Sequence, residues 1–133
     1  MHDHCSYDYA IVRVVPRVER EEFVNAGVIV SCPERDFLAC RIELDEPRVL
    51  ALHPGVDMQT VRTHLASIPV ICAGGAAAGP IGMLSARERF HWLVAPRSTM
   101  IQMSPVHTGK CKDPAALLDR LLDTMVRSAR ADP

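Results

Sequence analysis

Apolar and polar residues alternate with a period of two through the first third of the chain, which is the pattern of half-buried β-strands. The pattern predicts strands over 7–15, 23–32 and 37–44. Pro16 ends the first strand, because proline is confined to strand ends and edges. Gly27, inside the second strand, indicates a bulge or a close approach of two backbones. A short polar connection separates the second and third strands, so we expect them to form an antiparallel hairpin.

Beyond residue 44 the spacing of the apolar residues lengthens to that of an α-helix. A short helix is predicted over 48–52. Asp57 is a suitable N-cap for a second helix that continues to about residue 68. Ser85 and Glu88 have the spacing of a capping box, which predicts a third helix over 86–94.

The last helix has the clearest signals. Asp113 is a good N-cap and Pro114 is a favoured first-turn residue. One stripe of apolar residues follows at helical spacing: Leu117, Leu118, Leu121, Leu122, Met125 and Val126. A fourth strand is predicted over 99–104, whereas 74–80 and 106–112 are expected to be loops, the first of them flexible.

Strands come first along the chain and helices follow, which is typical of an α+β fold. We therefore expect one α+β domain over 1–133, with about four mainly antiparallel strands packed against two or three helices. The helices over 57–68 and 114–127 are expected to cover one side of the sheet. Residues 1–6 and 128–133 are expected to be flexible termini.

The composition fits this fold class. A length of 133 residues suits one domain, and 48% apolar residues with 23% charged residues is ordinary for a globular protein. No apolar run reaches the roughly 18 residues of a membrane helix, and the first residues do not resemble a signal peptide, so we expect a cytoplasmic protein with no membrane partner. The five cysteines include no CxxC pair, which favours reduced thiols. The net charge of −1 argues against nucleic acid as a partner.

Polar side chains gather after the third predicted helix and in the loop that follows the fourth strand. Arg97, Ser98 and Thr99 follow a helix end, where amides, hydroxyls and a guanidinium can together hold an anion such as a phosphate-containing ligand. His107 could add a titratable group, and Arg13 shares a strand face with two tyrosines. We take these five residues as ligand-binding candidates. A structural alternative stays open, in which Arg97 binds helix-end carbonyls and the hydroxyls close a turn.

Arg89 and Trp92 are candidates for contact with a partner protein, because arginine and tryptophan are enriched among interface anchors. A tryptophan is, however, more often simply the largest residue of the core. His2, His4 and Cys5 lack a second cluster of ligands at zinc-like spacing, and no local motif joins a cysteine to a histidine. We therefore expect no catalytic residue, no metal ion and no cofactor.

Seven short segments together resemble a known family. They are YDY (7–9), RVVPR (13–17), EFVNAGV (22–28), GPI (79–81), RFHWL (89–93), PRST (96–99) and SPVHTG (104–109). They resemble the bacterial domain-of-unknown-function family DUF3037, over almost the whole chain from about Tyr7 to Val126. The resemblance carries no established activity and transfers no catalytic residue. It implies genomic neighbours that encode HipA-like kinases.

Two functions follow as hypotheses. The first is a non-enzymatic partner or regulator of a HipA-like kinase. The alternative is a small anion- or nucleotide-binding sensor or enzyme that uses the Arg97–His107 region. A concave pocket that gathers Arg13, Arg97, Ser98 and His107 would favour the alternative, whereas a flat apolar patch would favour the partner.

Overall fold

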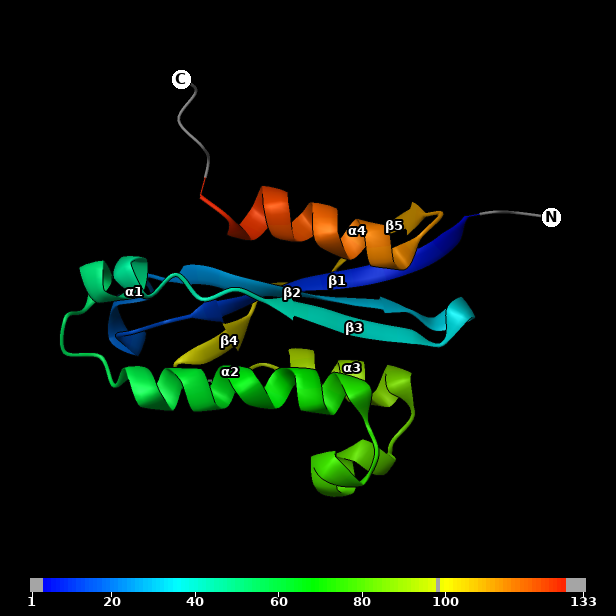
Figure 1. Ribbon diagram of the computed structural model, residues 1–133, viewed down its shortest axis with the longest axis horizontal. Coiled ribbons are helices and arrows are strands. Elements are labelled where there is room, and N and C mark those ends of the chain that lie inside the picture. The colour runs from blue at the N-terminus through cyan, green and yellow to red at the C-terminus, as the bar shows by residue number, and fades with distance from the viewer. Residues whose placement is uncertain (1–3, 98, 129–133) are drawn as a thin grey trace.

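A five-stranded antiparallel sheet forms the centre of the protein. The computed structural model describes residues 4–97 and 99–128. The strands are β1 (Cys5–Val14), β2 (Val24–Cys32), β3 (Phe37–Ile42), β4 (Ile101–Met103) and β5 (His107–Cys111). Their order is β3-β2-β1-β4, and β5 also pairs with β1 (Figure 1). The expected hairpin of the second and third strands is confirmed as β2–β3.

Helices lie on both faces of this sheet. The helices are α1 (Glu46–Leu52), α2 (Met58–Ala73), α3 (Ala86–Val94) and α4 (Pro114–Leu121), and shorter helical turns are η1 (Val18–Arg20), η2 (Pro33–Arg35), η3 (Ala76–Met83) and η4 (Leu122–Val126). Figure 1 shows α2 and α3 below the sheet and α4 above it. The α+β class with mainly antiparallel strands is confirmed. The prediction that α2 and α4 cover the same side of the sheet is wrong.

Two hydrophobic cores explain this arrangement. In β2, Ile29 packs against the core shared with α2 and α3, whereas Val28 and Val30 pack against the core shared with α4. Because successive side chains of a strand point to opposite faces, a strand that is apolar on both faces needs a covering layer on each. The apolar stripe of the last helix fills the second core, except for Met125, which is 39% exposed.

β4 and β5 lie along the same edge of β1 and together act as one strand with a gap. β4 pairs with the end of β1 and β5 pairs with its beginning, both antiparallel. In the gap, Ser104 continues the ladder: Ile11 N donates to Ser104 Oγ at 2.8 Å, and Ser104 N donates to Ile11 O at 2.9 Å. The prediction of a loop over 106–112 is therefore wrong. Its polar side chains belong to an edge strand, which lacks the apolar alternation of a buried one.

A β-bulge interrupts the pairing of β1 with β2, as Gly27 indicated. Val12 lies opposite Gly27 and Arg13 lies opposite Asn25, which leaves Ala26 as the extra residue. A Cβ atom at Gly27 would lie 2.7 Å from Arg41 O of the neighbouring strand, so glycine permits this close approach. The bulge changes which side chains of β2 face each core.

The helix starts follow the sequence signals. Asp57, Ser85 and Asp113 each accept hydrogen bonds from backbone amides of the first helical turn, and the capping box of α3 is complete. α2 continues past Pro69 to Ala73, five residues further than predicted, because its buried stripe continues after the proline.

Two other predicted boundaries need correction. The expected flexible loop over 74–80 instead enters the helical turns of η3. β1 begins at Cys5, two residues before the predicted start, and the Cys5 side chain is buried.

Within the described residues, no single helix has the length and apolar content to cross a membrane, although α2 and η3, bent by 65° at their junction, reach that length and composition as a pair.

Candidate functional site

Arg97 occupies the junction between the end of α3 and the sheet. Its Nη1 donates to Leu93 O at 2.9 Å and to Ala95 O at 3.4 Å, and its Nη2 donates to Trp92 O at 2.8 Å. The guanidinium also lies over the Trp92 ring, 4.4 Å from the ring centre. The side chain thus binds the last carbonyls of α3, as the structural alternative predicts. Held in this way, Arg97 lines three hollows, and two of them include other predicted site residues.

The first hollow is an apolar groove between α2, α3 and β4, which we call the Trp92 groove. Its volume is about 280 Å³, and its lining combines apolar side chains, including one tryptophan, with four polar ones. The lining residues are His64, Ser67, Ile68, Ile71, Trp92, Leu93, Arg97, Thr99, Ile101 and Met103. Trp92 is 40% exposed, so the largest aromatic side chain of the chain is not in the core. The groove offers apolar surface with a few polar groups at its rim.

Arg97 also lines a second hollow, which we call the two-arginine pocket. It has a volume of about 350 Å³ and is lined by Arg13, Val15, Val18, Glu21, Phe23, Arg97 and Gln102. Arg13 and Gln102 are direct partners across the β1–β4 pairing. The Arg13 guanidinium lies over the Phe23 ring, 4.1 Å from the ring centre. Two of the predicted ligand-binding residues thus meet in one pocket.

The remaining predicted ligand-binding residues lie elsewhere or outside the described residues. Ser98 lies outside them. Thr99 lines the Trp92 groove, and its hydroxyl donates to Ile101 O at 2.9 Å. His107 pairs with Tyr9 in the β1–β5 ladder, and the two rings stack with their centres 5.1 Å apart. Tyr9 is four residues from Arg13 in the same strand, or about 13 Å. His107 is thus not a lining residue of the two-arginine pocket.

Arg89, predicted as a partner contact, instead joins two segments of the backbone. Its Nε donates to Ile71 O at 2.9 Å, its Nη1 to Leu84 O at 2.6 Å and its Nη2 to Cys72 O at 3.3 Å. These carbonyls belong to the end of α2 and to the turn before α3. Of the two predicted partner residues, Trp92 presents surface to solvent and Arg89 stabilises the fold.

A charged network that the sequence did not predict joins β1, β5 and α3. Asp8 accepts from Arg87 Nη2 at 2.6 Å and from Thr108 Oγ1 at 2.7 Å, and Arg87 Nη1 donates to Ser31 Oγ at 2.9 Å. Burial would raise the pKa of Asp8, but the hydrogen bonds from Thr108 and Arg87, with the charges of Arg87 and His91, lower it below its ordinary value. The signal in the sequence was an acidic residue on the otherwise apolar face of β1.

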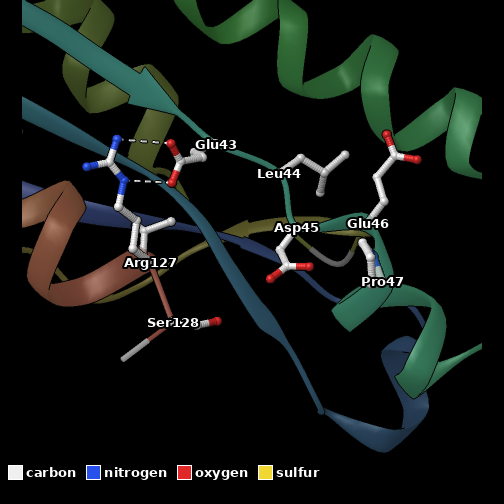
Figure 2. A pocket seen from close by; sticks show the side chains of 8 residues that line it. Glu43, Leu44, Asp45, Glu46, Pro47, Arg127 and Ser128 are labelled. Carbon is white, nitrogen blue, oxygen red and sulfur yellow. Dashed lines mark hydrogen bonds and ion pairs between the residues drawn. The ribbon is translucent and has the colours of Figure 1, made fainter. Parts of the chain in front are cut away.

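A separate hollow, of about 510 Å³, lies far from Arg97 in the sequence. It is formed where the segment after β3 meets the end of η4. Figure 2 shows Glu43 turned toward Arg127, with Asp45 and Glu46 pointing in other directions. Asp45 accepts from the backbone of α1, and Glu46 forms an ion pair with Arg62. Each carboxylate is therefore bound to a structural partner and does not face the others as an acid–base pair.

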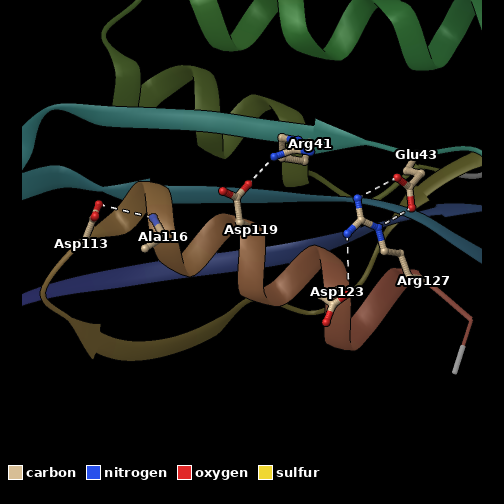
Figure 3. Close-up of polar contacts among 7 residues, drawn as sticks. All are labelled: Arg41, Glu43, Asp113, Ala116, Asp119, Asp123 and Arg127. Atoms are coloured by element: carbon tan, nitrogen blue, oxygen red, sulfur yellow. Dashed lines mark hydrogen bonds and ion pairs between the residues drawn. The ribbon is translucent and has the colours of Figure 1, made fainter. Parts of the chain in front are cut away.

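Polar contacts at this end of the protein attach α4 and η4 to the sheet. Arg41 of β3 binds Asp119 of α4, and Arg127 bridges Glu43 and Asp123 (Figure 3). The hydrogen bond from Arg127 lowers the pKa of Glu43. These side chains are exposed, so each pair contributes little to stability on its own.

The five cysteines are free thiols, as expected from their spacing. Cys32 Sγ lies 2.8 Å from Cys5 Sγ in the core beneath α4, and burial raises the pKa of Cys32 to about 11. The hydrogen bond with Cys40 and burial also raise the pKa of Cys72. A raised pKa keeps a thiol protonated and weakly nucleophilic. Within the described part of the chain, no group of three His, Cys, Asp or Glu residues could hold a metal ion.

Comparison with known proteins identifies the family. A family model described as "Protein of unknown function (DUF3037)" matches residues 9–126. The chain belongs to this family. No curated protein and no solved structure matches the chain.

Several DUF3037-like segments of the sequence contribute to the Trp92 groove and the two-arginine pocket. The segment 89–93 supplies Trp92 and Leu93 to the Trp92 groove, and 13–17 supplies Arg13 to the two-arginine pocket. The segment 96–99 carries Arg97, which lines both. The resemblance therefore involves surface hollows as well as the core.

Proposed function

We propose that this DUF3037 chain is a non-enzymatic partner-binding domain, and that its partner is a HipA-like kinase. The observation that carries the proposal is the 40% exposure of Trp92 beside an apolar groove. A large aromatic residue left half outside the core is typical of an interface anchor. The kinase is the partner that the family resemblance implies.

The fixed position of Trp92 supports this proposal. Arg97 lies over one face of its ring and is itself held by three helix-end carbonyls. A side chain that is already ordered loses less conformational entropy when a partner binds. The adjacent groove, about 280 Å³, has room for one large apolar side chain of the partner. A stable complex would also need roughly 1,000 Å² of buried surface around this anchor.

The arrangement of the candidates gives less support to the alternative, an anion- or nucleotide-binding sensor or enzyme built on the Arg97–His107 region. His107 stacks on Tyr9 and lines none of the hollows to which Arg97 contributes, although one of them, of about 320 Å³, extends to the neighbouring Val106. We further propose that the protein acts in the bacterial cytoplasm. Five free cysteines suit a reducing compartment, where unpaired thiols persist.

Co-expression with the HipA-like kinase encoded nearby tests this proposal. The two proteins are expected to co-elute in size-exclusion chromatography and to give a measurable heat of binding in calorimetry. Trp92→Ala should weaken the complex by at least about tenfold, as expected for an anchor residue. Met125→Ala is the matched control, because Met125 is 39% exposed and lies on the opposite face of the sheet. Separate elution at tens of micromolar without heat of binding would refute the proposal.

A further inference from the structure

We infer that the two-arginine pocket binds an oxyanion group, a phosphate or a carboxylate, between Arg13 and Arg97. The inference does not depend on the kinase partner proposed above, because it concerns a ligand of the isolated chain. This pocket has a volume of about 350 Å³. It brings together an arginine of β1 and an arginine of the segment after α3.

Arg13 is the first reason. Its Nε is buried and has no hydrogen-bond partner among the described residues. Its guanidinium lies over the Phe23 ring, a contact that positions the charge without satisfying its N–H groups. Buried polar groups in folded proteins are nearly always hydrogen-bonded, so this guanidinium is unusual in lacking any acceptor. The Nε itself is closed to solvent, so an oxyanion in the pocket would meet the terminal Nη groups of Arg13, which form no hydrogen bond among the described residues.

Arg97 is the second reason. All of its protein hydrogen bonds within the described chain go to carbonyl oxygens of the α3 end, and none goes to a carboxylate. Its positive charge is therefore oriented but not neutralised by an ion pair. A guanidinium fixed in this way is prepared for an anion, since little side-chain entropy remains to be lost on binding.

Gln102 and Glu21 define the selectivity of the pocket. Gln102 Nε2 donates to Thr99 O at 2.9 Å, which orders the amide beside Arg13, its partner across the strand pairing. Glu21 contributes the one carboxylate of the lining, so the two arginines leave the pocket with a net positive charge. This carboxylate repels an incoming anion, and its removal should strengthen binding.

Apolar side chains at the mouth indicate the class of ligand. Phe23 is 44% exposed and Val18 is 38% exposed, and both line the pocket beside the charges. The combination suits an oxyanion attached to an aromatic or aliphatic body, with the anionic end on the arginine side and the body against Phe23. Phenyl phosphate and benzoate represent the phosphate and carboxylate forms of such a ligand.

Titration of the isolated protein tests the inference with four probes: inorganic phosphate, sulfate, phenyl phosphate and benzoate. The fluorescence of Trp92, the single tryptophan, reports on Arg97, which lies 4.4 Å from its ring centre. Calorimetry under constant ionic strength gives the affinities. We expect saturable binding, tighter for a probe with a phenyl body than for inorganic phosphate. Comparison of phenyl phosphate with benzoate shows which oxyanion the site prefers.

Three variants complete the test with phenyl phosphate and benzoate. Arg13→Met should weaken binding by about tenfold or more, the usual effect of losing a charge-assisted hydrogen bond. Arg120→Met, an exposed arginine of α4 outside the pocket, is the control and should leave affinity unchanged. Glu21→Gln should increase affinity and, being at an exposed position, should leave the fold intact.

The outcomes are decisive in either direction. Non-saturating changes with all four probes, or equal affinity in wild type and Arg13→Met, would overturn the inference. If Arg13→Met does not fold, the Glu21→Gln comparison decides, because unchanged or weaker binding in that variant contradicts the positive pocket. Loss of kinase binding in Trp92→Ala has no bearing on this result, so the two proposals fail separately.

Discussion

Replacing Asp8 with asparagine tests whether the charged network between the sheet and α3 stabilises the fold. The Asp8 carboxylate is 16% exposed and accepts from Arg87 Nη2 at 2.6 Å and from Thr108 Oγ1 at 2.7 Å. Asparagine keeps the shape of the side chain and can still accept one hydrogen bond. It removes the negative charge that Arg87 faces.

The expected loss follows from these contacts. A hydrogen bond to a charged group contributes about 1.5–3 kcal/mol, but the Arg87 side chain is 37% exposed, so water can solvate it when the carboxylate is gone. We therefore expect Asp8→Asn to lower the free energy of unfolding by about 1–3 kcal/mol at pH 7.

The same contacts give the effect a defined pH dependence. The folded protein holds the pKa of Asp8 below its ordinary value, so folding favours the ionised carboxylate. The resulting stabilisation is fully present above the unfolded pKa of about 4 and is lost as the pH falls through the lower, folded pKa. The difference in unfolding free energy between wild type and Asp8→Asn should thus be constant near neutrality and should shrink below about pH 4.

Urea unfolding of both proteins at several values between about pH 2.5 and pH 7 measures this difference, since the other carboxylates titrate in both proteins and largely cancel. Asp123→Asn is the control, because its carboxylate is 67% exposed in a 3.5 Å pair with Arg127 and should matter by less than about 0.5 kcal/mol. A difference for Asp8→Asn that is below about 0.5 kcal/mol at pH 7, or that does not change at acidic pH, would refute this account of the network.

Three further substitutions probe the core beneath α4, the link between β4 and β5, and the contacts of Arg89. Leu121→Ala should cost about 2–5 kcal/mol in chemical denaturation, and a loss below about 0.5 kcal/mol would show that the α4 stripe is not core. Ser104→Ala should cost about 1–3 kcal/mol in the same assay, because it leaves the Ile11 amide without its acceptor; an unchanged midpoint would contradict the bridging role. In thermal unfolding, Arg89→Met should lower the midpoint more than Trp92→Ala does, since Arg89 binds three carbonyls; the reverse order would place Trp92 among the structural residues.

Local signals in the sequence predicted the elements whose stability is decided locally. The Ser85–Glu88 capping box starts α3 at the expected residue, and Asp113 with Pro114 starts α4. These interactions join residues within one helical turn, so the sequence alone contains them. The β2–β3 hairpin was equally readable, because alternation and a short polar connection specify such a pair.

Features that depend on distant segments were beyond sequence analysis. Arginine is a residue type common among interface anchors, which made Arg89 a candidate. Only the fold shows that its side chain binds the carbonyls of Ile71, Cys72 and Leu84. β5 is polar because it is an edge strand, so its sequence resembles a loop. Arg13 lies in β1 and Arg97 follows α3. The sequence identified both as candidates, but it could not show that they line the same pocket.

The most direct test of the central claim is NMR mapping of the partner surface. Isotope-labelled protein is titrated with the unlabelled HipA-like kinase, and the amide and indole signals are followed. The account predicts that the Trp92 indole and the residues of the Trp92 groove respond first, while signals from α4, on the opposite face of the sheet, stay unchanged. Perturbations centred on α4, or no change at tens of micromolar kinase, would contradict the claim that the Trp92 groove is the partner-binding surface.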